Sequence, residues 1–471
     1  MSDQSFTMTI GGKAVAGAAT YNVINPANGQ VIASAPDCAR DELEQAVAAA
    51  RAAFPGWAAR PISERRAVLL AIADAIDANV DVLARLVTAE QGKPLALAHF
   101  EVGFLTLWLR QTARMEIPEI VNQDDGERRS VTRRIPLGVV AAIIPWNYPI
   151  GQNAFKFGPA MLAGNTVVLK PSALTPLANL KLGEILRDIV PAGVLNIISG
   201  TDGLGEWVTS HPGFDRISFT GSTRTGRLVM ASAAKRLTGV TLELGGNDPA
   251  IVLPDVDIKV TVEKLFWAAF VNSGQLCLAT KRLYVHADIY DAFAAELVDY
   301  ARGVVVGEGL TEGVQLGPVS NRQQYNTVVG LIRDAQEKGY RFLTGGLPDE
   351  SAAGFFIAPT IIDNPPEDAR IVQEEQFGPV LPLLKFSDVD DVVARANGTD
   401  YGLGASVWSA DADAAYAIAQ RLQAGTVWVN EVQHLSPDVP FGGLKQSGLG
   451  TESGMAGLLD YTDAQTLTVK R

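Results

Sequence analysis

Cys277 is the residue of this sequence whose side chain is best suited to nucleophilic chemistry. It follows the polar, glycine-containing stretch 272–276, where backbone can come close to a bound group. A free thiol has a pKa of about 8.5 and reacts as its thiolate. A lone cysteine is nevertheless more often a buried structural residue than a nucleophile. Taken by itself, Cys277 therefore favours a place in the core.

A carboxylate with the right surroundings for a general base is Glu243. Leu242 and Leu244 flank it in an alternating pattern, so that its side chain faces the other way from theirs. Such a glutamate is usually exposed to solvent, whereas partial burial would raise its pKa toward that of a useful base. Gly245 and Gly246 follow it and permit a tight turn or the approach of a ligand.

Two polar side chains stand at the ends of short apolar runs. Asn147, between Pro145 and Pro149, follows the run 139–144, and its amide can donate to a developing oxyanion. A turn asparagine between prolines is an equally good interpretation. Lys170 ends the run 166–169 and can reach a ribose or a phosphate, although strand-end lysines commonly reach solvent.

The phosphate-binding and metal-binding signals are weak. Residues 219–226 lie between an expected strand and an expected helix, whose N-terminus favours a phosphate. The segment lacks the Lys-Ser/Thr pair of a P-loop, which disfavours kinase or ATPase chemistry, and no Gly-x-Gly-x-x-Gly follows a strand. The four histidines are scattered and the cysteines are unpaired, so we expect no metal site.

Short apolar runs that alternate with helical stretches surround these residues. The runs 139–144, 166–169, 194–198, 216–219 and 240–244 read as strands that are buried on both faces. The alternation restarts after residue 246, with strands at 250–253, 282–286, 380–386, 405–408 and 426–429 and a helix at 259–272. Two α/β domains with parallel sheets are therefore expected.

Composition sets the broad class of the protein. The 471 residues suggest two or three domains, and the net charge of −13 disfavours nucleic acid as a partner. Two cysteines cannot form the disulfide framework of a secreted protein. The first 17 residues do not resemble a signal peptide, and no apolar stretch reaches the length of a membrane span. We expect a cytoplasmic protein without a membrane partner.

Read together, the motifs resemble the aldehyde dehydrogenase superfamily over essentially the whole chain. Seven of them occur in the family's order, which makes the resemblance very specific. They are Pro145-Trp146-Asn147-Tyr148-Pro149, Lys170-Pro171-Ser172, Phe219-Thr220-Gly221-Ser222, Leu242-Glu243-Leu244-Gly245-Gly246, Gly274-Gln275-Leu276-Cys277, Glu375-Gln376-Phe377-Gly378-Pro379 and Pro440-Phe441-Gly442-Gly443.

The resemblance implies an α/β fold with a Rossmann-type parallel-sheet cofactor domain, a second α/β catalytic domain and a small β arm. The cofactor domain would take residues 1–117 and 137–245, and the catalytic domain residues 246–447. The segments 118–136 and 460–471 would be oligomerisation strands of a homodimer or homotetramer. Within them, 128–136 and 465–471 are charged and β-prone, and would be strands that pair with another subunit or ordinary surface segments.

The resemblance also implies a reaction: oxidation of an aldehyde to a carboxylic acid with NAD(P). Cys277 would attack the aldehyde, Asn147 would stabilise the oxyanion, and Glu243 would activate the water that hydrolyses the thioester. Lys170 would also assist, and Glu452 would be a secondary acid–base residue. The implied cofactor-binding residues are Ile144, Pro145, Trp146, Lys170, Ser172, Ala173, Gly203, Phe219, Gly221, Ser222, Leu244, Gly245, Glu375 and Phe377.

Departures from the family pattern concern the cofactor and the substrate. Ala173 stands where many NAD-preferring members carry a glutamate, so NADP is admissible, although we favour NAD. Val271 and Phe155 replace an aromatic residue and a tryptophan, which predicts a wider tunnel. The candidate substrate-lining residues are Tyr148, Gln152, Phe155, Val271, Leu276, Leu278 and His434.

Three other functions stay open at this point. A CoA-acylating dehydrogenase typically lacks the base, so Glu243 argues against that branch. A cysteine-dependent esterase or thiol hydrolase would need a histidine near Cys277, and none adjoins a recognisable catalytic element. A non-catalytic protein on this fold would have no reason to keep nucleophile, base and amide together.

Overall fold

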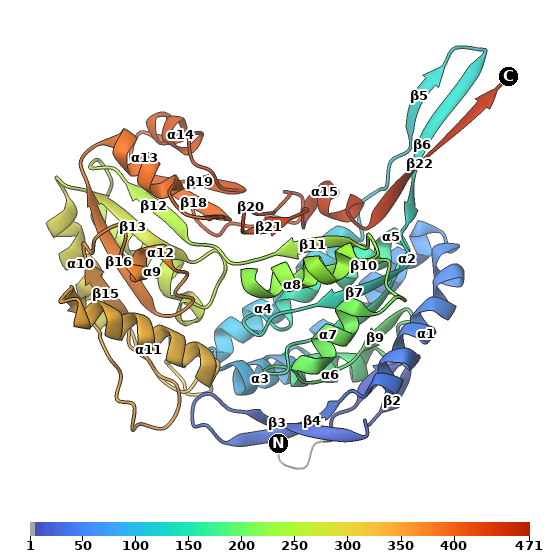
Figure 1. Ribbon diagram of the computed structural model, residues 1–471, viewed down its shortest axis with the longest axis horizontal. Helices are drawn as coiled ribbons and strands as arrows, with labels where there is room; N and C mark the ends of the chain where they lie inside the picture. Colours follow the sequence, from blue (N-terminus) through green and yellow to red (C-terminus); the bar gives the residue numbers. More distant parts are fainter. Residues whose placement is uncertain (1–4) are drawn as a thin grey trace.

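Two parallel-stranded sheets, each covered by helices, occupy opposite ends of the molecule, as the alternation of apolar runs and helical stretches predicted (Figure 1). The computed structural model describes residues 5–471. The expected α/β fold is therefore confirmed. Within the described residues, no helix has both the length and the apolar character needed to cross a membrane.

The first sheet has eight strands. In order across the sheet they are β2 (Lys13–Val15), β1 (Met8–Ile10), β9 (Leu195–Ile197), β8 (Thr166–Lys170), β7 (Val139–Ile143), β10 (Arg216–Thr220), β11 (Gly239–Glu243) and β21 (Gly448–Leu449). The five strands from β9 to β11 are parallel and match the five predicted runs. The short antiparallel strands at the edges were not predicted, because two or three residues are too few to show a periodicity. β21 joins this sheet from a part of the chain beyond both expected α/β segments.

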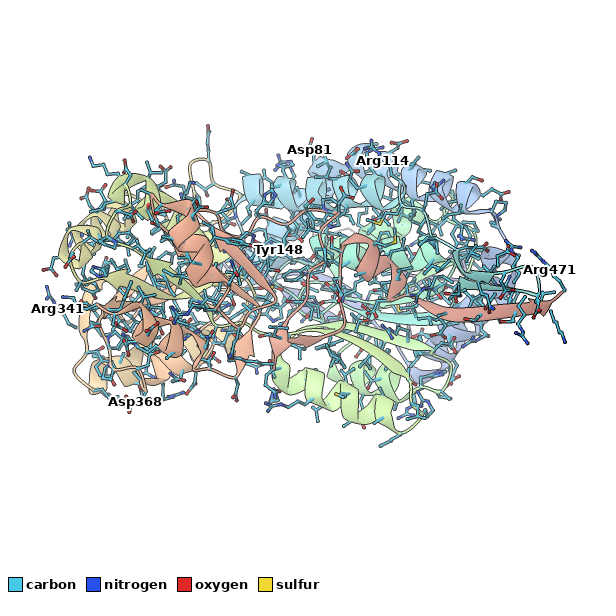
Figure 2. The ribbon with its side chains drawn as sticks, turned by 90° about the horizontal axis from the view of Figure 1, so that it is seen from above. Asp81, Arg114, Tyr148, Arg341, Asp368 and Arg471 are labelled. Atoms are coloured by element: carbon cyan, nitrogen blue, oxygen red, sulfur yellow. The ribbon has the colours of Figure 1, made fainter. Side chains whose placement is uncertain are left out.

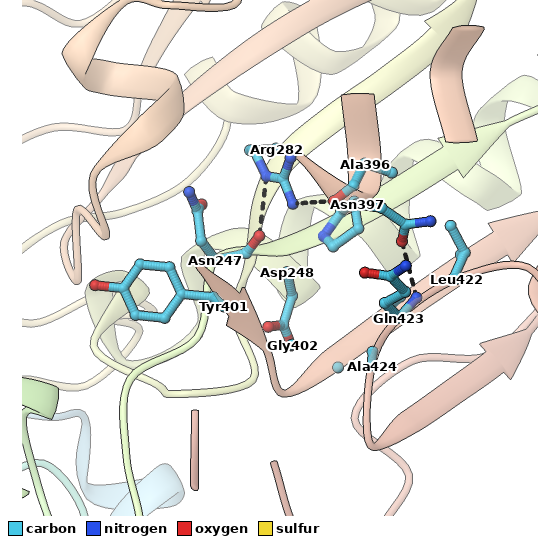
Figure 3. A pocket seen from close by; sticks show the side chains of 13 residues that line it. Asn247, Asp248, Arg282, Ala396, Asn397, Tyr401, Gly402, Leu422, Gln423 and Ala424 are labelled. Carbon is cyan, nitrogen blue, oxygen red and sulfur yellow. Dashed lines mark hydrogen bonds between the residues drawn. The ribbon is translucent and has the colours of Figure 1, made fainter. Parts of the chain in front are cut away.

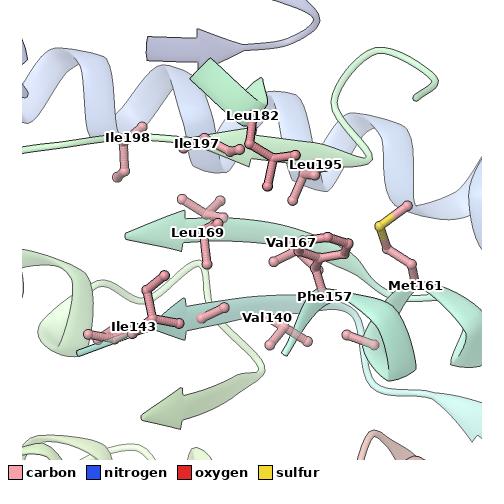
Figure 4. Packing of buried hydrophobic residues seen from close by; sticks show 14 of the residues in the cluster. Val140, Ile143, Phe157, Met161, Val167, Leu169, Leu182, Leu195, Ile197 and Ile198 are labelled. Atoms are coloured by element: carbon pink, nitrogen blue, oxygen red, sulfur yellow. The ribbon is translucent and has the colours of Figure 1, made fainter. Parts of the chain in front are cut away.

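Helices cover both faces of the first sheet. They are α1 (Arg40–Ala58), α2 (Ile62–Asp77), α3 (Val80–Gln91), α4 (Leu95–Thr112), α5 (Phe157–Ala163), α6 (Leu177–Leu186), α7 (Asp202–Ser210) and α8 (Thr223–Ala234). α1 contacts β7, β8 and β9 and also α7, whereas α5 and α6 contact α2. Figure 4 shows Val140, Val167 and Leu195 of three strands packed with Phe157 of α5. Burial on both faces explains why these strands are apolar throughout.

The second sheet has seven strands, and every pair of neighbours is parallel except β14 and β15. Their order is β14 (Arg341–Thr344), β15 (Thr360–Asp363), β16 (Val380–Phe386), β13 (Thr280–His286), β12 (Asp248–Val252), β18 (Gly404–Trp408) and β19 (Thr426–Val429). Its helices are α9 (Ile258–Phe270), α10 (Tyr290–Arg302), α11 (Arg322–Glu337), α12 (Arg370–Gln373), α13 (Val389–Asn397) and α14 (Ala412–Ala419). Ala250 and Val252 pack with α9 and α10, while Ile251 between them packs with α11. Successive residues of β12 thus fill two different cores.

Smaller elements complete the chain. A hairpin precedes α1, a short antiparallel pair links the two halves, and two single-turn helices flank the candidate residues. These elements are β3 (Ala19–Ile24), β4 (Val31–Asp37), β17 (Tyr401–Gly402), β20 (Leu444–Lys445), η1 (Gly151–Phe155), η2 (Val271–Gly274) and α15 (Gly454–Leu459).

A three-stranded antiparallel sheet projects from the body of the molecule (Figure 1). Its strands are β5 (Ile120–Asp124), β6 (Arg128–Pro136) and β22 (Thr462–Lys470). The charged segments that the sequence analysis considered as strands for another subunit pair with each other within this chain, from Thr462 opposite Pro136 to Lys470 opposite Arg128. Most of the side chains of β5 and β22 are exposed.

Candidate active site

The carboxyl ends of four neighbouring strands meet where the strand order of the first sheet reverses. Ile143 of β7 lies beside Lys170 of β8 on one side and Phe219 of β10 on the other. β10 in turn places Thr220 beside Glu243 of β11. Ligands bind at such points because the connecting helices leave toward opposite faces. Five of the predicted residues lie at the carboxyl ends of these strands or just after them: Asn147, Lys170, Gly221, Ser222 and Glu243.

A sharp turn of the backbone brings Cys277 to the same place from the second half of the chain. α9 ends at Phe270 and not at the expected residue 272, because residues 272–274 all adopt left-handed conformations with φ between 53° and 71°. At Gly274 a Cβ would lie 2.2 Å from the carbonyl oxygen of Gly378. Consecutive left-handed residues are unfavourable, and such strain gathers at functional sites.

Buried side chains hold this turn from inside. Gln275 donates from Nε2 to the Asn272 carbonyl at 2.8 Å, and its Oε1 accepts from the Ser320 amide at 2.8 Å. Ser273 donates from Oγ to the Gly317 carbonyl at 2.7 Å. The polar stretch that drew attention in the sequence is therefore the set of groups that fixes the turn before Cys277.

Asn147 is joined to that turn by hydrogen bonds in both directions. Its Nδ2 donates to the Gln275 carbonyl at 2.9 Å, and its own carbonyl accepts from Asn272 Nδ2 at 3.1 Å. The carbonyl also accepts from the buried ammonium of Lys93 at 2.9 Å. An amide nitrogen carries two N–H groups, so one remains for a ligand beside Cys277.

Cys277 and Glu243 form a buried acid–base pair. Only 8% of Cys277 and 3% of Glu243 are exposed, so the carboxylate does not face solvent as an alternating strand suggests. Burial first, and the Glu452 carboxylate second, raise the pKa of Glu243 to about 8. Burial and the charge of Glu243 raise the pKa of the Cys277 thiol well above its usual range. Burial thus disfavours the charged forms of a thiol and a carboxyl group that lie within electrostatic range of each other.

Glu452 lies in the same buried cluster, where it pairs with a lysine that the sequence analysis missed. Its Oε1 is 2.5 Å from Nζ of Lys156, which precedes α5 and is fully buried. Burial raises the pKa of Glu452, and Lys156 opposes that rise. A single lysine in the apolar stretch 154–163 was the only available signal, since its partner lies 296 residues away.

The residues expected around the nicotinamide end of a cofactor face one another across the two halves. Glu375 accepts from the Gly246 amide at 2.9 Å, and a Cβ on Gly245 would lie 2.3 Å from Glu375 Oε2. The glycine pair after Glu243 therefore makes room for this carboxylate. The rings of Phe377 and Trp146 contact each other edge to face, with 5.4 Å between their centroids. The backbone of Phe377 is left-handed, with φ of 47°.

The other cofactor candidates lie along the edge of the first sheet. Ser222 is the N-cap of α8 and accepts from the Thr225 amide at 3.3 Å, which leaves an exposed helix N-terminus suited to a phosphate. Lys170 is buried at the end of β8, and Ala173 is half-buried three residues further on. Gly203 lies in the first turn of α7. A buried lysine, a partly buried carboxylate and an exposed helix N-terminus are groups that suit the riboses and the pyrophosphate of a dinucleotide.

The candidate substrate-lining residues differ in their surroundings. Phe155 is buried, with its ring 5.8 Å from Phe104 and 6.1 Å from Trp108 of α4, two aromatic residues that the sequence analysis did not single out. Gln152 beside it is buried. Tyr148 lies between the two halves of the molecule in Figure 2.

The remaining candidate substrate-lining residues include apolar residues that pack around Cys277. Leu278 is buried in one cluster with Cys277, and Leu276 and Leu435 pack against it while partly exposed. Val271 is partly exposed at the start of the turn. His434 is exposed, and its carbonyl accepts from Trp428 Nε1 at 3.0 Å. Leu403, Trp428 and Phe441 are further buried neighbours of Cys277 and Leu278, which the sequence analysis did not place at the nucleophile.

A second buried ion pair supports the Asn147 segment. Lys93 pairs with Glu101, whose Oε1 accepts from the amides of Ile150 and Gly151 at 2.8 and 2.9 Å. The Lys93 ammonium also lies 3.6 Å from the centroid of the Tyr148 ring. Neither residue carried a local signal of function, because a lysine and a glutamate near a helix are normally solvated. Within residues 5–471, no group of three or more His, Cys, Asp or Glu side chains is arranged to hold a metal ion.

Known proteins resemble this chain over nearly its whole length. The sequence profile of the aldehyde dehydrogenase family matches residues 14–467. A phenylacetaldehyde dehydrogenase of Pseudomonas fluorescens is 41% identical over 467 residues, which cover 96% of this chain and 92% of the relative. An NADP(+) succinate-semialdehyde dehydrogenase of Escherichia coli is 39% identical, with 95% and 94% covered. The crystal structure of an NAD-dependent aldehyde dehydrogenase from Sinorhizobium meliloti has a TM-score of 0.96 at 35% identity, with 99% and 94% covered.

Proposed function

The chain belongs to the aldehyde dehydrogenase family, whose members oxidise aldehydes to carboxylic acids, and we propose that Cys277 is its nucleophile. The observation that carries this assignment is the set of hydrogen bonds between Asn147 and the turn before Cys277. They hold an amide donor and a thiol at one point, beside a buried carboxylate. A nucleophile, an oxyanion donor and a base in mutual reach are what acyl chemistry requires.

The reaction begins with the thiol giving its proton to Glu243. Burial raises the pKa of the Cys277 thiol and also that of the Glu243 carboxyl group. The proton therefore passes between two buried groups, and the thiol that gives it up is not solvated. The thiolate then attacks the aldehyde carbon and forms a thiohemiacetal. The Asn147 amide and the Cys277 backbone N–H donate to the developing oxyanion, and a donor of this kind lowers the barrier by roughly 3 to 4 kcal/mol.

Oxidation and hydrolysis complete the cycle. A bound nicotinamide dinucleotide would supply the hydride acceptor for oxidation of the thiohemiacetal, so that a thioester on Cys277 would remain. Once Glu243 has passed on the thiol proton, its carboxylate removes a proton from water, and the resulting hydroxide attacks the thioester carbonyl. Glu243 then returns that proton to the departing Cys277 thiolate, so that the acid and the thiol are released. Lys156 and Glu452 are placed to pass the proton on from Glu243, because Glu452 lies within electrostatic range of Glu243 and pairs with Lys156.

The cofactor is a nicotinamide dinucleotide, and we favour NAD. Trp146, Glu375 and Phe377 would hold the nicotinamide end, with Lys170 at the adenosine ribose and the α8 N-terminus at the pyrophosphate. The remaining candidates are Ile144, Pro145, Ser172, Ala173, Gly203, Phe219, Gly221, Leu244 and Gly245, all of which border the same strand ends or the first turn of α7.

Changing Ala173 to glutamate should shift the enzyme further toward NAD. A carboxylate there would repel the 2′-phosphate of NADP and accept from the free ribose hydroxyls of NAD. Because the position is only half-buried, we expect kcat/KM with NADP to fall roughly ten- to a hundredfold relative to NAD. The measurement is kcat/KM with each cofactor, and Ala173→Gln is the neutral control. Equal losses with both cofactors would place the adenosine ribose elsewhere.

Neutral apolar or aromatic aldehydes should be the preferred substrates. Cys277 is buried in a cluster with Leu278, Leu403, Trp428 and Phe441. The carboxylate of a charged substrate would lose its hydration among these apolar side chains and find no partner there. We expect kcat/KM for phenylacetaldehyde to exceed that for succinate semialdehyde by at least about tenfold, because an unpaired charge costs more than 1.4 kcal/mol to bury. A panel of aliphatic, aromatic and charged aldehydes, assayed with NAD and NADP in parallel, measures this.

The same panel separates the rival functions. The hydrolytic enzyme forms the free acid whether or not CoA is present, whereas acyl-CoA as the product would overturn the assignment of Glu243. Ester cleavage as the main activity, with no aldehyde-dependent reduction of cofactor, would point to a thiol hydrolase.

Three broader assignments accompany this proposal. Residues 1–117 and 137–245 form the cofactor domain and residues 246–447 the catalytic domain. The exposed, projecting sheet of β5, β6 and β22 serves a homodimer or homotetramer, because sheet edges left open in this way favour pairing or cover. Both cysteines are free thiols, which suits the reducing environment of the cytoplasm.

A further inference from the structure

A buried lysine behind the nucleophile joins the Cys277 segment to the carboxylate on the cofactor side. Lys281 lies on β13, and only 3% of its side chain is exposed. Its ammonium donates to the carbonyls of Cys277 at 2.5 Å and Leu276 at 3.0 Å. The same nitrogen lies 3.4 Å from Oε1 of Glu375. One cation thus contacts both the nucleophile's backbone and the carboxylate that is expected to hold a ribose.

A second buried carboxylate lies on the neighbouring strand. Asp248 of β12 is buried at the start of the pairing between β12 and β13. Figure 3 shows that the guanidinium of Arg282 turns instead to carbonyl oxygens, to which it donates at 2.9 Å (Asn247) and 2.7 Å (Ala396). Burial raises the pKa of Asp248 to about 7, and the strongest opposing influence is the Lys281 ammonium. Lys281 therefore pairs with the partly buried Glu375 and opposes the effect of burial on Asp248.

Charged groups from three strands act on the Cys277 thiol. Glu243 on β11 and Asp248 on β12 disfavour its thiolate, whereas Lys281 on β13 favours it. The Tyr148 hydroxyl, from the segment after β7, also lies within electrostatic range. Of these groups Lys281 is the one cation, and its distance to the Cys277 carbonyl fixes it close to the sulfur-bearing residue.

We propose that Lys281 is a positioning residue of this enzyme, which clamps the Cys277 segment against Glu375 and supplies the positive charge that sustains the Cys277 thiolate. The inference rests on the proposed role of Cys277. Buried ammonium groups are costly unless they are engaged, and this one is engaged by two carbonyls of the nucleophile's segment and by the Glu375 carboxylate, while the charge of Asp248 acts on it from a longer distance.

The test is the pH dependence of Cys277 alkylation by iodoacetamide in the full-length enzyme without cofactor. A Cys38→Ala background leaves one thiol. Lys281→Met should raise the thiol pKa by about one unit, so that alkylation at pH 7.5 is about tenfold slower. Asp248→Asn should shift the pKa in the opposite direction and speed alkylation. Lys281→Arg should restore most of the wild-type rate, since it keeps the charge and the donors.

An electrostatic role predicts that Lys281→Met and Asp248→Asn shift the pKa of the Cys277 thiol in opposite directions. Loss of packing alone would move both variants in the same direction, and that result, or a Lys281→Met profile equal to wild type, would overturn the inference. Lys264→Met, on the exposed side of α9, is the control for a lost surface charge and should leave the profile unchanged.

A double variant keeps the test valid where Lys281→Met alone is too unstable, because neutralising Asp248 as well removes a buried negative charge that the Lys281 ammonium opposes. Asp248→Asn and the double variant Asp248→Asn/Lys281→Met differ only in the lysine, so their rates should again differ about tenfold. Equal rates would overturn the inference. Failure of the proposed function looks different: Cys277→Ala would then still oxidise aldehydes.

Discussion

Replacing Cys277 by alanine should abolish aldehyde-dependent reduction of the cofactor, with kcat reduced by at least about 10⁴-fold. Removing the nucleophile of a covalent mechanism removes the whole reaction path, and losses of about 10⁶ in kcat are known for catalytic units that act together. The change should leave the fold intact, because only a sulfur atom is lost from a small cluster. The measurement combines steady-state assays of cofactor reduction with thermal unfolding.

The matched control for this change is the other cysteine of the chain. Cys38 is buried in the core of the first sheet, and burial raises its pKa to about 12, so it should be chemically inert. Cys38→Ala should keep near-wild-type turnover. Wild-type enzyme should lose activity when one thiol is alkylated, and Cys277→Ala should not be labelled. Substantial turnover in Cys277→Ala would remove the proposed mechanism altogether.

The second large effect is expected for Glu243→Gln, which should release one equivalent of reduced cofactor in a burst and then nearly stop. Oxidation on Cys277 does not require a base at position 243 once the thiolate has formed, whereas hydrolysis of the thioester does. General-base catalysis contributes about 10²- to 10⁴-fold, so kcat should fall by that factor. Rapid-mixing measurements of reduced cofactor give the burst amplitude and the steady rate separately.

The ionisation of Glu243 predicts how kcat changes with pH. Glu243 works in its ionised form, and its pKa is raised to about 8, so the active fraction grows as the pH rises from 6 to 9. Wild-type kcat, where hydrolysis limits it, should rise over that window and level off above it. In Glu243→Gln this rise in kcat should be absent, while the burst becomes faster at higher pH because solvent must then take the thiol proton.

Glu263→Gln on the exposed face of α9 is the control, since it neutralises a carboxylate outside the site. It should retain the wild-type rate and pH profile. A linear time course with full turnover in Glu243→Gln would show that another group activates the water. A burst that is followed by acyl-CoA release on adding CoA would move the protein to the acylating branch.

Local patterns were sufficient for the elements that carry the site. Strands such as β7 and β8 are buried on both faces, so their apolar runs stand out in the sequence, and β16 and β19 have the predicted bounds. The end of α9 was placed two residues too late, because a left-handed turn at 272–274 breaks a helix without a proline to announce it. Short edge strands such as β1 and β21 lack any period and were missed.

The sequence by itself determined which residues carry reactive groups, since their motifs stand in a fixed order along the chain. It could not determine what sustains them. Lys93, Lys156 and Lys281 are each single lysines whose partners come from other elements, as far as 296 residues away for Glu452. A charge is informative only once its surroundings are known, because burial and pairing set its energy. Only the tertiary structure decided that these three lysines are buried with their charges close to Asn147, Glu452 and Cys277.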